Sequence, residues 1–192
     1  MKHTSENQEY PYEIFDYNHA TAILRQDFPS EWDDLVSLLS SFSLTKEDIL
    51  TPGGRKSPMA GKLDGFLYQR GWEERWFNTS VVVDGYEMNT PTHGIDCFKN
   101  RIGIEVEWNN KDPFFDRDLN NFRLLHSLNA LSVGVIITRC SHLQQLFKDL
   151  GKGSSYGAST THMEKLIPRI VGGGSGGCPV LAIGISEYLY TD

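Results

Sequence analysis

The sequence predicts an α/β fold in which a mixed β-sheet is flanked by helices. Residues 101–106 alternate apolar and polar side chains with the period of two that is typical of a strand with one buried face. Residues 133–138 (VGVIIT) and 180–185 (VLAIGI) are short apolar runs of the kind found in strands buried on both faces. The amphipathic segment 115–131 separates the first two of these runs, which indicates a strand–helix–strand crossover.

The N-terminal part of the chain predicts one helix after a polar start. Residues 1–12 are expected to be loosely ordered. Residues 28–42 are expected to form an amphipathic helix, with Ser30 as its N-cap and Asp33 three residues on. One apolar stripe of this helix faces the core: Trp32, Leu35, Leu39 and Phe42.

Glycine, proline and basic residues fill residues 51–62 and predict a loop. A short helix is expected at 62–72, with its end at Gly71. Residues 79–85 (TSVVVDG) are rich in valine and predict a strand.

Residues 94–108 predict a β-hairpin with Lys99 and Asn100 as its two-residue turn. That turn sets two facing pairs, Phe98 with Arg101 and Asp96 with Gly103. One face of the hairpin then carries Asp96, Gly103, Glu105 and Glu107. The other face carries Ile95, Cys97, Ile102, Ile104 and Val106.

The C-terminal half alternates helices with the two apolar strands. The helix at 115–131 presents one apolar side: Leu119, Phe122, Leu125 and Leu128. Further segments are expected as a helix at 142–150, a polar loop at 151–162, one or two helical turns within 160–170 and a glycine-rich connection at 172–179. We expect residues 1–192 to form a single domain.

Composition limits the function without deciding it. The net charge of −7 argues against nucleic acid as a partner, but basic residues gather in a few segments and can line a local cleft. The three cysteines are scattered without a C-x-x-C pair, and no apolar run is long enough to cross a membrane. No secretory leader is visible, so a cytoplasmic location without membrane association is expected.

Glu105 and Glu107 lie two residues apart on one face of the predicted strand, where their charges repel. Asp96 lies on the same face of the neighbouring strand. A divalent cation bound by these oxygen ligands would offset the repulsion. The residues alone leave alternatives open: the solvated face of an edge strand, a glycosidase pair, or a metal-dependent hydrolase of small phosphate esters.

Residues 96–107 (DCFKNRIGIEVE) resemble the active-site strand pair of the PD-(D/E)xK nucleases, in the branch of the restriction endonucleases BglII, BstYI and BamHI. Segments 15–24, 70–77 and 179–185 are similar to other parts of these enzymes. Glu107 stands where most of these nucleases have lysine, as glutamine or glutamate does in this branch.

The resemblance implies a type II restriction endonuclease with a restriction-endonuclease-like core. It implies Mg²⁺-dependent hydrolysis of double-stranded DNA by a homodimer at a short palindrome, leaving a 5′-phosphate and a 3′-hydroxyl. Asp96, Glu105 and the carbonyl of Val106 would bind the metal, and Glu107 would orient or deprotonate the attacking water. Residues expected to contact DNA are Asn109, Asn110, Lys111, Ser154, Ser155, Thr160, Thr161 and His162. The alternative is a catalytically inactive DNA-binding module of the same fold.

Overall fold

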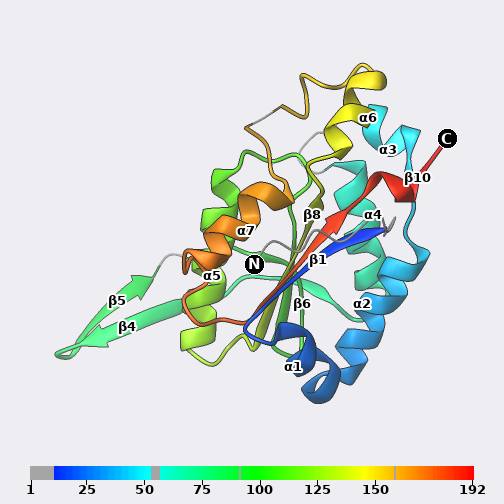
Figure 1. Ribbon diagram of the computed structural model, residues 1–192. Helices are drawn as coiled ribbons and strands as arrows, with labels where there is room; N and C mark the ends of the chain where they lie inside the picture. The colour runs from blue at the N-terminus through cyan, green and yellow to red at the C-terminus, as the bar shows by residue number, and fades with distance from the viewer. Residues whose placement is uncertain (1–10, 53–56, 91, 158) are drawn as a thin grey trace.

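The computed structural model describes residues 11–52, 57–90, 92–157 and 159–192. Its centre is a six-stranded sheet in the order β1-β9-β8-β7-β6-β3 (Figure 1). The strands are β1 (Tyr12–Tyr17), β3 (Glu73–Arg75), β6 (Ile95–Lys99), β7 (Ile102–Val106), β8 (Val133–Arg139) and β9 (Val180–Ile185). The central strands β9, β8 and β7 are parallel, whereas β1, β6 and β3 pair antiparallel with their neighbours. The predicted mixed sheet is therefore confirmed.

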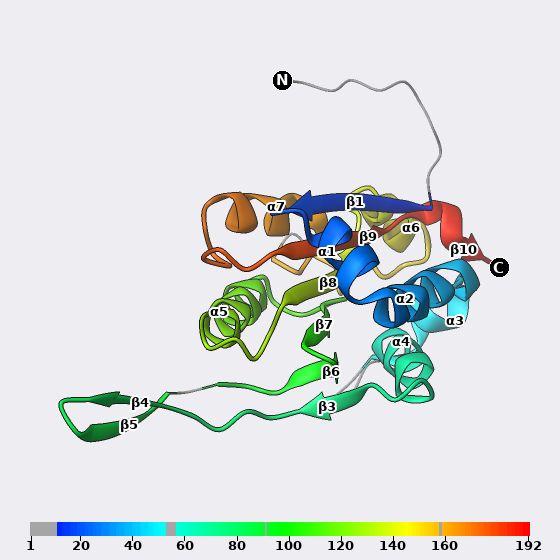
Figure 2. The same ribbon diagram turned by 90° about the horizontal axis from the view of Figure 1, so that it is seen from below.

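Helices cover both faces of this sheet (Figure 2). One face is covered by α1 (Ala20–Asp27), α2 (Pro29–Ser41), α3 (Lys46–Leu50), α4 (Pro58–Tyr68) and α6 (Leu143–Asp149). The opposite face is covered by α5 (Pro113–Ser127) and α7 (Met163–Val171). Each layer has its own buried cluster, so the sheet is apolar on both sides. None of the helices that the structure describes is both long and apolar enough to cross a bilayer.

Two smaller sheets lie outside the central one. Strand β2 (Leu44–Thr45) pairs in parallel with β10 (Tyr190–Thr191), which follows the short helix η1 (Glu187–Leu189). Strands β4 (Thr79–Val83) and β5 (Tyr86–Thr90) form a hairpin that projects from the body of the molecule (Figure 2). The strand predicted at 79–85 is therefore confirmed, as the first arm of this hairpin.

The helix predicted at 28–42 is confirmed as α2, but its predicted cap is wrong. Phe28 is the N-cap and makes no side-chain hydrogen bond, and Pro29 occupies the first helical position. Proline suits that position because its missing N–H has no partner there in any helix. Ser30 and Asp33 consequently lie inside the helix instead of capping it.

Helix α4 begins earlier than predicted. The Ser57 hydroxyl caps it by accepting a hydrogen bond from the Ala60 amide at 3.1 Å, and the helix ends at Tyr68, before Gly71. The loop predicted at 51–62 is therefore wrong over its last five residues. Its residues 53–56 lie outside the described residues, as do residues 1–10 of the segment predicted to be loosely ordered. That prediction is wrong for Tyr12, which begins β1.

The hairpin β6–β7 turns one residue later than predicted. Asn100 and Arg101 form the turn with φ values of 45° and 69°, so that Lys99 pairs with Ile102. The same register pairs Phe98 with Gly103 and extends to Asp96 beside Glu105. Moving the turn by one residue changes each pair by two positions, which leaves the two faces of β7 as predicted.

Ile95 departs from its predicted face. It packs with Phe98 in the cluster beneath α5, whereas Cys97 and Ile104 belong to the cluster on the other side of the sheet. The pairing of β6 with β3 shifts register between Glu73 and Arg75, and this irregularity interrupts the alternation at the start of β6.

Helix α5 packs closely on the sheet and ends at Ser127, four residues before the predicted end. Leu128, expected in its apolar stripe, is 45% exposed because the helix has already ended. A Cβ on Gly134 of β8 would lie 2.3 Å from the ring of Phe122, so only glycine fits beneath this helix. The helices predicted at 142–150 and within 160–170 are confirmed as α6 and α7.

Candidate active site

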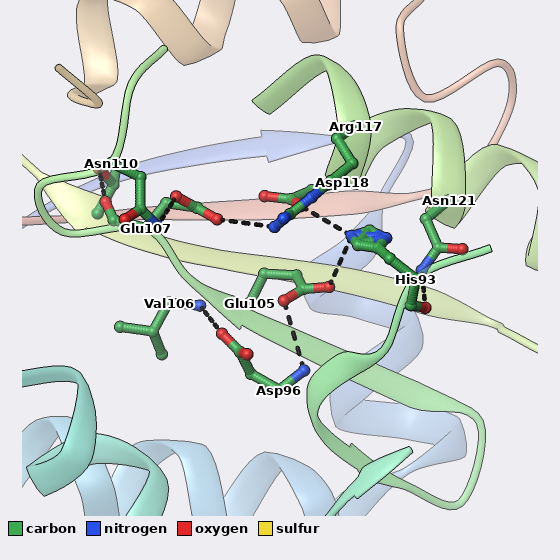
Figure 3. Close-up of polar contacts among 10 residues, drawn as sticks. His93, Asp96, Glu105, Val106, Glu107, Asn110, Arg117, Asp118 and Asn121 are labelled. Atoms are coloured by element: carbon green, nitrogen blue, oxygen red, sulfur yellow. Dashed lines mark hydrogen bonds and ion pairs between the residues drawn. The ribbon is translucent and has the colours of Figure 1, made fainter. Parts of the chain in front are cut away.

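Asp96 meets the end of strand β7 through two hydrogen bonds (Figure 3). Its Oδ2 accepts from the Val106 amide at 3.2 Å, and its own amide donates to Oε2 of Glu105 at 3.4 Å. The N–H and C=O of one strand residue point to the same side of the strand, so the Val106 carbonyl also points towards β6. The structure thus brings the three predicted metal ligands together.

Glu105 is 1% exposed, and its side chain lies on the face of β7 that α5 covers. Its Oε1 accepts no hydrogen bond within the described part of the chain, and its contact there is Nε2 of His93 at 3.7 Å. Burial raises the pKa of Glu105 well above its ordinary value, and the neighbouring carboxylates, first that of Asp118, raise it further.

Glu107 is also 1% exposed and is held from two sides. Its Oε2 accepts from the Asn110 side chain at 2.5 Å, and its Oε1 lies 3.3 Å from Nη2 of Arg117. Burial raises the pKa of Glu107 to about 9, with a further contribution from the charge of Asp118. Asn110, predicted to contact DNA, therefore also fixes this carboxylate.

Three further residues form a polar cluster with Glu105 and Glu107 and were not predicted: His93, Arg117 and Asp118. Asp118 is fully buried and lies 2.9 Å from Nη2 of Arg117 and 3.0 Å from Nε2 of His93 (Figure 3). Burial raises the pKa of Asp118 to about 6, while Arg117 acts in the opposite direction. Burial, together with the charge of Arg117, lowers the pKa of His93 to about 4.

A cleft of about 760 Å³ opens on the opposite side of β7 from α5. Asp96 and Val106 line it, whereas Glu105 and Glu107 do not. The other lining residues come from α3, α4 and the segment between them, from β3, from the segment after β7 and from the loop after α6: Ile49, Thr51, Pro52, Ser57, Ala60, Glu74, Trp108, Asn109, Asn110, Lys152, Ser155 and Tyr156. Asp96 is thus the carboxylate of the predicted triad that reaches this cleft directly, and the prediction that it shares one face with Glu105 and Glu107 is wrong.

The two segments predicted to contact DNA lie side by side. Lys111 pairs with Thr160 in an isolated β-bridge, and the Thr161 amide donates to the Asn110 carbonyl at 2.9 Å. Asn110 and Lys111 are exposed, as are Ser154 and Ser155, and Asn109 and His162 are partly exposed. Thr160 and Thr161 are buried, so their side chains face the protein interior.

Arg139, at the end of β8, holds the loop that contains Thr160. Its Nη2 donates to the Thr160 hydroxyl at 2.7 Å, and its guanidinium lies 5.9 Å from the ring centre of Tyr156. The Tyr156 hydroxyl in turn accepts from the indole N–H of Trp108 at 3.1 Å. The loop is thereby tied to the residue that follows Glu107. The sequence had not indicated this role for Arg139.

The family model described as "Restriction endonuclease BglII/BglIII" matches residues 12–185 of the chain. This range begins with β1 and ends with β9, and it contains the whole site described above. No curated protein matches the sequence.

Proposed function

The chain belongs to the BglII/BglIII family of restriction endonucleases, and we propose that it cuts double-stranded DNA at a short palindrome with Mg²⁺ as cofactor. As a member it is a type II site-specific deoxyribonuclease, a hydrolase that binds DNA. We further propose that residues 1–192 act as a single nuclease domain in the cytoplasm. The products would carry a 5′-phosphate and a 3′-hydroxyl.

Asp96, Glu105 and the carbonyl of Val106 would hold the Mg²⁺. Their support is the meeting of these groups at the end of β7, where Asp96 faces the cleft. The donors are all oxygen atoms, which Mg²⁺ prefers, and Oε1 of Glu105 is buried without a hydrogen bond in the described structure. When bound, Mg²⁺ would neutralise charge on the scissile phosphate and make a nearby water more acidic.

Glu107 would orient or deprotonate the attacking water. Hydrogen bonds from Asn110 and Arg117 fix the position of its carboxylate, and each carboxylate oxygen retains a further lone pair for water. Burial raises the pKa of Glu107, so its carboxylate, once ionised, is a stronger base than that of an exposed glutamate.

The adjacent segments after β7 and before α7 would contact the DNA. Asn109, Asn110 and Ser155 line the cleft beside Asp96, with Lys152 supplying positive charge for phosphate. Lys111 and Ser154 are exposed next to them. Thr160, Thr161 and His162 would shape the base-contacting loop. A homodimer with one such site per strand would read a palindrome.

Incubation of supercoiled plasmid with Mg²⁺ or with EDTA tests this function. We expect discrete fragments with Mg²⁺ and none with EDTA, and sequencing of the ends would give the target and the cutting position. Ligation of the fragments without prior phosphorylation would establish the 5′-phosphate. Sequence-specific binding without cutting under any divalent metal would favour the inactive DNA-binding module instead.

A further inference from the structure

Glu105 faces two different environments with its two oxygen atoms (Figure 3). Oε2 lies on the side of Asp96, 3.4 Å from that residue's amide. Oε1 points towards α5, where it lies 3.7 Å from Nε2 of His93 and accepts no hydrogen bond from the residues described. The metal ligands proposed above account for the Asp96 side alone.

On the α5 side, three potential metal ligands converge. One donor atom each of His93, Glu105 and Asp118 lies within 4.8 Å of the other two. Glu105 and Asp118 are at most 1% exposed, and Oε1 of Glu105 lacks a hydrogen bond in the described part of the chain. Buried oxygen atoms without donors are costly unless a proton or a cation satisfies them.

The cation already present does not satisfy Oε1 of Glu105. Arg117 contacts Glu107 and Oδ1 of Asp118, and Asp118 also shares a side-chain hydrogen bond with Glu107. Oε1 of Glu105 still has no donor among the described residues. Asn121 donates to the backbone carbonyl of His93 at 3.3 Å and so helps to hold the imidazole in place. A histidine nitrogen with two carboxylates is a donor set for transition metals, whereas Mg²⁺ prefers oxygen alone.

We propose that His93, Glu105 and Asp118 bind a second divalent cation of the transition-metal class, on the α5 side of β7. Glu105 bridges this site to the Mg²⁺ position beside Asp96. The bridge is the one point at which this inference rests on the proposed function. The second cation holds Glu105 in the orientation that keeps its other oxygen beside Asp96.

Mn²⁺ binding, counted by electron paramagnetic resonance of the free ion, tests the site without any DNA. The wild-type chain is expected to bind two Mn²⁺ ions. His93→Gln and Asp118→Asn should each bind one, and so should Asp96→Asn. The matched control is His142→Gln, which removes a histidine that lies against the carboxylate of Glu187 far from this site and should still bind two.

Competition with excess Mg²⁺ identifies which ion remains. The ion left in Asp96→Asn should resist displacement because a histidine nitrogen binds it, and the ion left in His93→Gln should be released. Circular dichroism confirms that each variant is folded. Two Mn²⁺ ions in both His93→Gln and Asp118→Asn would overturn the inference, as would a single wild-type ion that Mg²⁺ releases. Two ions without any DNA cleavage would instead refute the proposed function alone.

Discussion

Replacing Glu107 with glutamine is expected to stabilise the metal-free protein at alkaline pH and to change its stability little at acidic pH. Burial raises the pKa of Glu107 from its ordinary 4.5 to about 9. The folded chain therefore holds this proton over a pH range in which the unfolded chain has lost it. The stability that protonated Glu107 contributes is fully present below the pKa of this group in the unfolded chain. It is lost as the pH rises towards and through the pKa of the group in the folded chain. Glutamine does not titrate, so the variant escapes this loss.

The size of the effect follows from the window between the two pKa values. Each pH unit inside it removes ~1.4 kcal/mol, so the interval from about pH 5.5 to about pH 8.5 removes at most ~4 kcal/mol. The pKa of about 9 already includes the stabilising effect of Asn110 and Arg117 on the ionised form. Relaxation of the site and entry of water when Glu107 ionises reduce the loss to ~1–3 kcal/mol. For a chain of this length, the difference in Tm at alkaline pH corresponds to ~2–12 °C.

Thermal unfolding followed by circular dichroism in EDTA measures this effect at both pH values. Glu87→Gln on β5 is the matched control, because Glu87 is exposed on the projecting hairpin of β4 and β5. Its Tm should differ from that of the wild type by the same small amount at both pH values. A gap between Glu107→Gln and the wild type that does not widen with pH would refute the reasoning.

Gly134→Ala is expected to destabilise the chain by ~1–3 kcal/mol in urea unfolding, because the new Cβ meets the Phe122 ring at 2.3 Å; Phe122→Leu in the same chain should recover part of the loss. Asp96→Asn should abolish plasmid cleavage while gel-shift binding survives, and a near wild-type rate would contradict the metal site. Asn110→Ala should move the acid limb of the cleavage pH profile upward, because its hydrogen bond lowers the pKa of Glu107; an unmoved limb would exclude Glu107 as the base. Ca²⁺ should support specific binding without cleavage, and efficient cutting with Ca²⁺ alone would contradict the role given to the metal.

The acidic face of β7 could be predicted although the turn of its hairpin was not. Asn100 and Arg101 both adopt positive φ, a conformation that Asn-Gly would have indicated and that arginine rarely adopts. The faces of β7 nevertheless follow from the alternation of Ile102, Ile104 and Val106, which depends on the strand alone. The sequence therefore did not determine how β6 pairs with β7, but it did determine which side chains of β7 share a face.

Asp118 carries a signal in the sequence, whereas His93 carries none. Asp118 lies three residues after Phe115 and four before Phe122, which puts it on the buried stripe of α5. A carboxylate in such a stripe indicates a partner in the core. His93 lies just before β6, and it reaches Glu105 because this segment is held against α5 by the contacts of His93 with Asp118 and Asn121.

Arg139 could not be assigned because its partners are distant in the sequence. It ends the apolar run of β8 and would usually be expected to point to solvent. Its contacts with Thr160 and Tyr156 depend on how the loop after α6 returns to the sheet. The pattern of apolar and polar residues along one segment does not show where a distant loop packs.

The bridge between Lys111 and Thr160 has a consequence for changing the target of such an enzyme. Backbone hydrogen bonds from Thr161 to Asn110 and from Asp112 to Ser159 join the two segments on either side of it. Grafting one segment from a relative with another target would leave these backbone groups facing a foreign partner. The two segments thus form one structural unit. If they contact the bases as proposed, a change of target requires that both segments be exchanged together.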